Sequence, residues 1–207
     1  MESPAVRLEA FSDGVFAIAI TLLIIEIKIP SIEDVHTKKE LWAAFTHAWP
    51  SWLAFLTSFI TILISWVSHA YGFRLITKTS SKFTYANGLL LLSIVVMPFP
   101  TAAVAEFIRT DVAQPAITLY CGASLFTSIA WNILMHTTLY PESLYKPGVK
   151  FDKIKKTLLH IRLGLLLYSV TFILSFWLPF IAFTLVILSY VVWLIIGIGL
   201  KEERMIA

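Results

Sequence analysis

Charged residues divide this chain into long apolar stretches with charge-free centres, and this pattern restricts the fold more than any other feature. The charge-free runs cover residues 14–25, 41–73, 83–105, 112–141 and 163–200. Only 14% of the 207 residues are charged, whereas a typical soluble domain has about 25%. So few charges cannot cover the surface of a soluble fold of this length. The pattern therefore predicts an integral membrane protein whose apolar faces contact lipid.

The lengths of these runs predict where helices cross the membrane. At about 1.5 Å per residue, the run 163–200 would form a helix of roughly 57 Å, nearly twice the hydrocarbon thickness. It should fold back on itself at 177–179, because this segment contains a proline and an interfacial tryptophan. The run 41–73 is also too long for one crossing. Pro50 divides it into an amphipathic helix near 38–48 and a following span.

The predicted fold class is all-α, with six transmembrane helices in one domain that covers residues 1–207. No second copy of the N-terminal pattern follows, so the six spans form one repeat. A kink or break is expected in the third span, at Pro98 and Pro100. The predicted spans are about 8–29, 50–73, 83–105, 116–138, 157–177 and 179–200.

The basic residues predict the orientation. With six spans and the N-terminus inside, twelve of the 16 Lys and Arg residues lie on the inner side and four on the outer side. This asymmetry follows the positive-inside rule. We therefore expect a multi-pass protein of the cell (plasma) membrane with both termini cytoplasmic. The basic loop 142–156 is either a topology signal or a site for anionic lipid.

Composition also excludes several function classes. The sequence pI is about 9.0, but the basic residues lie between hydrophobic segments, so no nucleic-acid surface is expected. Cys121 is the single cysteine and is expected to be a buried small residue that forms no intrachain disulfide. The histidines lie on different segments and show no metal-ligand spacing, and no serine has an acidic or histidine partner at a catalytic spacing. We therefore expect that the protein binds no metal and no cofactor and is not an enzyme.

Charged and polar residues at the start of the first span form the most informative stretch. Arg7 and Asp13 lie at or just inside the start of this helix, where unpaired charges are costly. They are six residues apart and do not share a helix face, so each is expected to find a partner on another helix. His69 in the second span and Asn87 in the third lie at a similar predicted depth. The group is either a polar clasp that locks helices together or a proton or ion relay.

The first helix also carries a stripe of aliphatic residues. Ile18, Leu22 and Ile25 recur at spacings of four and three, so they lie on one face, and Thr21 lies beside that face. On a lone helix, such a stripe faces lipid or the protein core.

The start of the first span carries a family resemblance. The segment Arg7-x-x-x-Phe11-Ser12-Asp13, followed by Gly14 and an Ile/Leu helix, resembles prokaryotic members of the transmembrane protein 175 family, which are potassium-permeable channels. The resemblance covers nearly the whole chain through the six-span layout. Weaker matches follow at Trp66, His69, Asn87 and Met97-Pro98-Phe99-Pro100.

This resemblance implies a homotetramer of the six-helix repeat around a central pore lined by the first helix. It implies that Ile18, Leu22 and Ile25 form an aliphatic constriction and that Thr21 contributes to selectivity. It also implies that the inter-helix polar network includes Ser12, Asp13 and their partners, and that potassium is the permeant ion.

The sequence itself is consistent with an aliphatic gate and with the absence of a carbonyl filter. There is no Thr-Val-Gly-Tyr-Gly segment, so a carbonyl filter is absent, and an aliphatic ring can gate by dewetting. Such a ring gives only modest potassium selectivity. Glu26 near the outer pore mouth either concentrates cations or pairs with Lys28 or a neighbouring helix. The alternative function is a proton-coupled secondary transporter, but transporters favour internal repeats and midplane polar sites.

Overall fold

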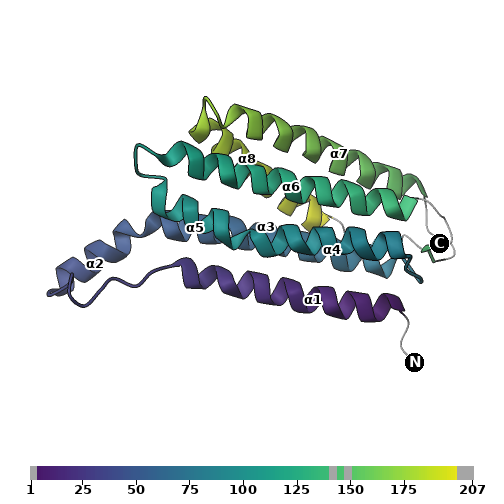
Figure 1. Ribbon diagram of the computed structural model, residues 1–207, viewed down its shortest axis with the longest axis horizontal. Coiled ribbons are helices and arrows are strands. Elements are labelled where there is room, and N and C mark those ends of the chain that lie inside the picture. The colour runs from purple at the N-terminus through teal and green to yellow at the C-terminus, as the bar shows by residue number, and fades with distance from the viewer. Residues whose placement is uncertain (1–3, 140–143, 147–150, 200–207) are drawn as a thin grey trace.

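The computed structural model of the chain is a bundle of helices, and it describes residues 4–139, 144–146 and 151–199 (Figure 1). Within this described part, six helical stretches are long and apolar enough to cross a membrane, which confirms the predicted fold class. The helices are α1 (Pro4–Leu22), η1 (Leu23–Glu26), α2 (Lys38–His47), α3 (Trp49–Arg74), α4 (Ser81–Val96), α5 (Pro98–Phe107), α6 (Ala113–Leu139), α7 (Phe151–Leu174) and α8 (Pro179–Gly199).

Prolines lie at the starts of several helices. Pro98 occupies the first turn of α5, so the third apolar stretch is divided at Met97 into α4 and α5. Pro50 lies in the first turn of α3, and Pro179 is the first residue of α8. Proline fits these positions because the first backbone N–H groups of a helix have no partner within it. The first span begins and ends earlier than the predicted 8–29, because α1 starts at Pro4, tightens into the 3₁₀ helix η1 and ends at Glu26.

The packing order places α6 at the centre of the bundle. It packs against α4, α5, α7 and α8, whereas α1 packs only against α3, α4 and η1 among the principal contacts. Figure 1 shows α1 along one edge of the bundle, with the starts of α1, α4 and α7 at the same end. Among the described residues, one broad face of α1 therefore packs against no other helix as a principal contact.

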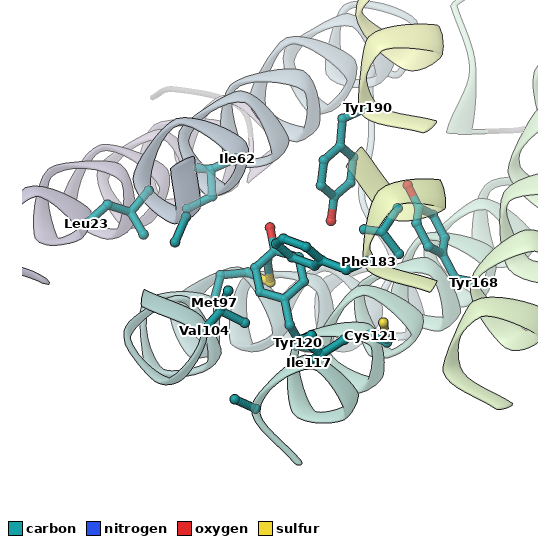
Figure 2. Close-up of a cluster of buried hydrophobic side chains, with 14 of the residues drawn as sticks. Leu23, Ile62, Met97, Val104, Ile117, Tyr120, Cys121, Tyr168, Phe183 and Tyr190 are labelled. Carbon is teal, nitrogen blue, oxygen red and sulfur yellow. The ribbon is translucent and has the colours of Figure 1, made fainter. Parts of the chain in front are cut away.

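The main core lies where α3, α5, α6 and α8 meet. Tyr120 on α6 and Phe183 on α8 pack edge to face, with ring centroids 5.4 Å apart (Figure 2). The Tyr120 hydroxyl lies 3.2 Å from Oγ of Ser58, which lies 2.6 Å from Oγ1 of Thr101. These pairs satisfy buried polar groups that would otherwise be costly in a membrane. Cys121 is buried in the same core, as expected.

The short helix α2 extends from one end of the bundle (Figure 1). It begins with a capping box, in which Thr37 accepts from the backbone N–H of Glu40 while the Glu40 carboxylate accepts from the backbone N–H of Thr37. No α2 residue is buried, and Trp42 is 71% exposed. Exposed tryptophan beside charged residues is typical of the membrane–water interface.

At the opposite end of the bundle, the segment after α3 pairs with the described residues between α6 and α7. The backbone N–H of Thr77 donates to Leu144 O at 2.8 Å, and that of Lys146 donates to Leu75 O at 2.9 Å. This short antiparallel contact, centred on Ile76 and Tyr145, joins the loop after α3 to the segment between α6 and α7. Part of the basic loop 142–156 lies outside the described residues, including Lys150.

Candidate functional site

The two faces of α1 differ in what they contact. Phe16, Ala19 and Leu23 are buried against the neighbouring helices. Ile18 and Ile25 are exposed on the opposite face. They share this face because seven residues correspond to nearly two helical turns. The helix is thus apolar on both faces, and one apolar face is largely exposed in the described part of the subunit.

The predicted constriction residues all lie on this outward face. Their exposed fractions are 63% for Ile18, 42% for Leu22 and 69% for Ile25. Phe11 is exposed on the same face at 62%, seven residues before Ile18. The prediction did not include Phe11, although this spacing of nearly two turns would have indicated it.

Thr21 is exposed beside the aliphatic residues. Its hydroxyl donates to the backbone carbonyls of Ala17 and Ile18, at 3.0 and 2.9 Å. Because the proton is used within the helix, the lone pairs of the oxygen remain available on the outward side. This is the arrangement that a hydroxyl needs to contact a cation.

A chain of hydrogen bonds links the buried face of α1 to α4 and α3. Oγ of Ser12 donates to Leu8 O at 2.8 Å and accepts from Nδ2 of Asn87 at 2.9 Å. Oδ1 of Asn87 lies 2.7 Å from Nε2 of His69. All three side chains are buried. The structure thus brings together three of the predicted polar residues, from three helices.

The directions of these bonds fix the tautomer of His69. Ser12 uses its proton on Leu8, so it accepts from the amide nitrogen of Asn87, and the amide oxygen faces His69. Nε2 of His69 therefore carries the proton and donates to Asn87. The imidazole packs between Phe16 and Phe73, with ring centroids at 5.3 and 4.6 Å.

Asp13 and Trp66 form a separate contact. The indole Nε1–H of Trp66 donates to Oδ1 of Asp13 at 2.9 Å. Trp66 is exposed at the edge of the subunit, unlike the buried Asn87 group. The predicted network therefore consists of two parts that both join α1 to α3. The Asn87 group is buried, and the Asp13–Trp66 contact is partly exposed.

Arg7 does not join either part in this structure. It is exposed, and no ion pair links it to any residue in the described part of the chain. Ser12 follows Arg7 by five residues, which places the two about 140° apart around the helix at about 100° per residue. Arg7 lies instead on the outward face with Phe11 and Ile18.

The region around Glu26 holds an ion pair. Nζ of Lys28 lies 3.1 Å from Oε2 of Glu106, and both side chains are exposed. The backbone of Glu26 ends η1, and its side chain lies outside the described part of the structure. Lys28 thus pairs with Glu106 on α5.

A stripe of hydroxyl residues along α3 was not predicted from the sequence. Thr57, Thr61 and Ser65 are buried, and their spacing of four places them on one inward face. The hydroxyls of Thr57 and Thr61 donate to carbonyls of their own helix. Among the residues that the structure describes, no three His, Cys, Asp or Glu side chains cluster as a metal site would require.

Comparisons with known proteins match this architecture. Residues 7–98 match the family model described as "Endosomal/lysosomal potassium channel TMEM175". A potassium channel of Chamaesiphon minutus is 42% identical over 175 residues, covering 84% of this chain and 86% of that protein. A potassium channel of Streptomyces collinus is 36% identical over 171 residues, covering 82% of each chain.

Solved structures agree. The crystal structure of a lysosomal potassium-selective channel TMEM175 homolog from Chamaesiphon minutus superposes with a TM-score of 0.85 and 37% identity, covering 95% of this chain and 99% of that one. The family expected from the Arg7–Asp13 segment is thereby confirmed. With six apolar helices and these relatives, this multi-pass membrane protein belongs to the TMEM175 family of ion channels.

Proposed function

We propose that this protein is a potassium-permeable cation channel that conducts ions passively through a pore lined by α1. The single observation that carries this proposal is the unpartnered apolar face of α1, on which Ile18, Leu22 and Ile25 are exposed. Its relatives are named potassium channels, and family membership favours a channel over a proton-coupled transporter and over an enzyme.

A pore lined by this face requires several subunits, because one helix cannot surround an ion. We propose a homotetramer in which four copies of α1 face a common axis. The exposed face then contacts the pore and its opposite face packs on α3 and α4, as α1 does here. Potassium and other monovalent cations would be permeant ions and not bound cofactors.

Within the pore, the aliphatic side chains would form a narrow constriction that limits flow by excluding water. Four Thr21 oxygens, whose protons are held by their own helices, would offer lone pairs to a partly dehydrated cation. Hydroxyl oxygens replace few of the hydration contacts that a carbonyl filter supplies. The selectivity for potassium over sodium should therefore be modest.

We also propose that the protein resides in the plasma membrane with both termini in the cytoplasm. The starts of α1, α4 and α7 lie at one end of the bundle (Figure 1), and this end holds most of the Lys and Arg residues in the described part of the chain. Positive charge marks the cytoplasmic side of short loops. In this orientation the His69–Asn87–Ser12 group lies in the cytoplasmic half of the membrane.

Ion flux into liposomes tests the proposal. The purified protein is reconstituted, and flux is measured under a potassium gradient and then a sodium gradient, for the wild type, for Ile18→Asn, and for Leu166→Asn as a control on the exposed side of α7. We expect flux that favours potassium and that rises in Ile18→Asn, because a polar ring admits water. Folded, reconstituted protein without flux under either gradient would refute a channel.

A further inference from the structure

No side chain of helix α2 is buried within the described part of the subunit, although α2 is only ten residues long. A helix of fewer than about 12 residues is marginal in water, because most helical stability comes from the packing of an apolar face. The capping box at Thr37 and Glu40 satisfies backbone groups of the first turn, but it covers no apolar side chain. A surface outside this chain is therefore needed to hold α2.

One face of α2 is apolar. At about 100° per residue, Leu41, Trp42 and Phe45 fall within an arc of about 100° around the helix. All three side chains are exposed, and the rings of Trp42 and Phe45 pack edge to face with their centroids 6.2 Å apart. The remaining arc carries the polar side chains of Lys39, Glu40, Thr46 and His47. The helix is therefore amphipathic, with its apolar face uncovered in the described part of the subunit.

The position of α2 in the fold places this face at the membrane surface. The helix ends at His47, and the spanning helix α3 begins two residues later, at Trp49. Figure 1 shows α2 extending obliquely from this end of the bundle, where α5 and α7 also end. Exposed aromatic side chains mark the ends of the spans here, at Trp49, Phe107 and Trp177. Because such rings collect where lipid headgroups meet water, α2 leaves the bundle at that level.

The place of Lys38 on α2 distinguishes a lipid surface from a second copy of the chain. Lys38 is exposed on the same arc as Trp42 and Phe45, which follow it by four and seven residues. Lysine is depleted from the cores of protein–protein interfaces. At a membrane, its aliphatic stem lies along apolar surface while its ammonium reaches the headgroups. Lys38 begins α2, and the aromatic rings follow toward α3, so the charge lies farther from the spans, as a lipid interface requires.

We propose that α2 binds the lipid bilayer surface, with Leu41, Trp42 and Phe45 inserted among the headgroups of the leaflet at this end, the outer leaflet in the proposed orientation. Interfacial helices bury their apolar face about 5–10 Å into the boundary between headgroups and acyl chains. The segment 27–37 joins α2 to the end of η1, so the lipid contact also anchors the chain that leaves α1. This contact requires neither the pore nor a particular number of subunits.

The charges of this segment specify the class of lipid. Three carboxylates, from Glu33, Asp34 and Glu40, outnumber the two ammonium groups of Lys38 and Lys39. Helices that select anionic lipid carry clusters of Lys and Arg instead. Zwitterionic phospholipid is therefore sufficient, and the insertion of apolar side chains supplies the binding free energy.

The test attaches a nitroxide spin label to Phe45→Cys or to Ala43→Cys in the full-length protein, reconstituted in phosphatidylcholine nanodiscs. Both positions are exposed and lie about 160° apart around the helix, and both variants keep Trp42. Cys121 is the single native cysteine and is buried, so the label attaches to the added cysteine. Electron paramagnetic resonance measures collisions of the label with oxygen, which concentrates in lipid, and with a nickel chelate, which stays in water.

We expect the label at position 45 to collide more with oxygen than with the chelate, and the label at position 43 to show the reverse. Adding Trp42→Ser should shift the label at position 45 toward the chelate, because it removes the largest inserted side chain. Thr46→Ser on the polar arc keeps a hydroxyl there and should leave this label unchanged.

Equal access of the chelate to positions 43 and 45 would overturn the membrane contact. Shielding of position 45 from both reagents, with broadening by a second label, would assign this face to another copy of the chain and overturn the lipid contact. The contrast between the two positions should be the same after phosphatidylglycerol is added to the nanodiscs. A contrast that appears only with this anionic lipid would overturn binding through the apolar face.

Discussion

The amide of Asn87 on α4 donates to the hydroxyl of Ser12 on α1 at 2.9 Å, although the two residues are 75 positions apart in the sequence. Both side chains are fully buried. The same amide bonds His69 through its oxygen, so Asn87 joins α1 to α3 as well. This side chain helps to hold the buried face of α1 against α3 and α4, so that Ile18 points away from them.

A double-mutant cycle should detect this link. We expect Asn87→Ala and Ser12→Ala each to lower the free energy of unfolding by about 1–3 kcal/mol, because each leaves a buried partner unpaired. The double mutant should be less destabilised than the sum, by about 0.5–1.5 kcal/mol, the range of hydrogen bonds between membrane helices. Reversible unfolding in mixed detergent measures the three variants. Strict additivity would show that the two side chains do not interact.

The contact between Asp13 and Trp66 gives a second prediction. Asp13→Ala removes the acceptor of the indole N–H and should destabilise the packing of α1 on α3 by about 1 kcal/mol, which lowers the fraction of assembled oligomer. Asp13→Asn keeps an acceptor oxygen and should behave nearly as the wild type. Light scattering after gel filtration measures the assembly of both variants. An Asp13→Ala protein that assembles and conducts normally would show that this contact does not support assembly.

Thr21 gives a prediction about selectivity. Thr21→Val keeps the shape of the side chain and removes the outward oxygen, so the potassium-to-sodium permeability ratio should fall by about twofold or more toward one. Thr184→Val is the control, because its hydroxyl makes a similar intrahelical bond on α8. Reversal potentials in asymmetric potassium and sodium solutions give the ratio. An unchanged ratio in Thr21→Val would exclude these hydroxyls as the source of selectivity.

The capping box of α2 predicts a dependence on pH. The backbone N–H groups of His36 and Thr37 donate to the Glu40 carboxylate at 2.8 and 3.0 Å and hold the pKa of Glu40 below its ordinary value of 4.5. The carboxylate therefore stabilises the start of α2 above pH 4.5, and this contribution is lost as the pH falls further.

Hydrogen exchange measures this effect. We expect protection of the His36 and Thr37 backbone amides, which donate to Glu40, to decrease between neutral pH and about pH 3, after correction for the intrinsic exchange rate. In Glu40→Gln the protection should be lower at neutral pH and should not change over the same range. A wild type whose protection is constant with pH would show that the carboxylate does not stabilise the cap.

Membrane burial explains why the helices were predictable from the sequence. Charges cannot enter lipid without a partner, so the charge-free runs marked the spans, and prolines marked the breaks at Met97 and after Leu174. His69 and Asn87 were predicted to belong to one polar group because buried polar side chains in a membrane need partners, and the family resemblance added Ser12 to this group. The structure brings these three together.

Other parts of the site depend on three-dimensional contacts that spacing does not specify. Arg7 was grouped with the polar network, but its position around α1 directs it outward. The pairing of Lys28 with Glu106 joins two segments 78 residues apart, and no local pattern marks it. A pocket of about 240 Å³ beside His69 lies among α3, α4, α6, α7 and α8, and its existence depends on how large side chains fit together.

The central claim, that α1 lines the pore, is tested most directly by cysteine accessibility. Cys121 is the single native cysteine and is buried, so reaction at an added cysteine is distinguishable. Ile18→Cys and Leu166→Cys are matched, because both positions are 63% exposed in the isolated subunit. Ag⁺ is a small monovalent cation that binds thiolates and should reach only the position that meets water. We predict that Ag⁺ blocks potassium flux through Ile18→Cys channels and leaves Leu166→Cys and the wild type conducting. An Ile18→Cys channel that conducts and resists Ag⁺, or equal block at both positions, would contradict a pore lined by α1.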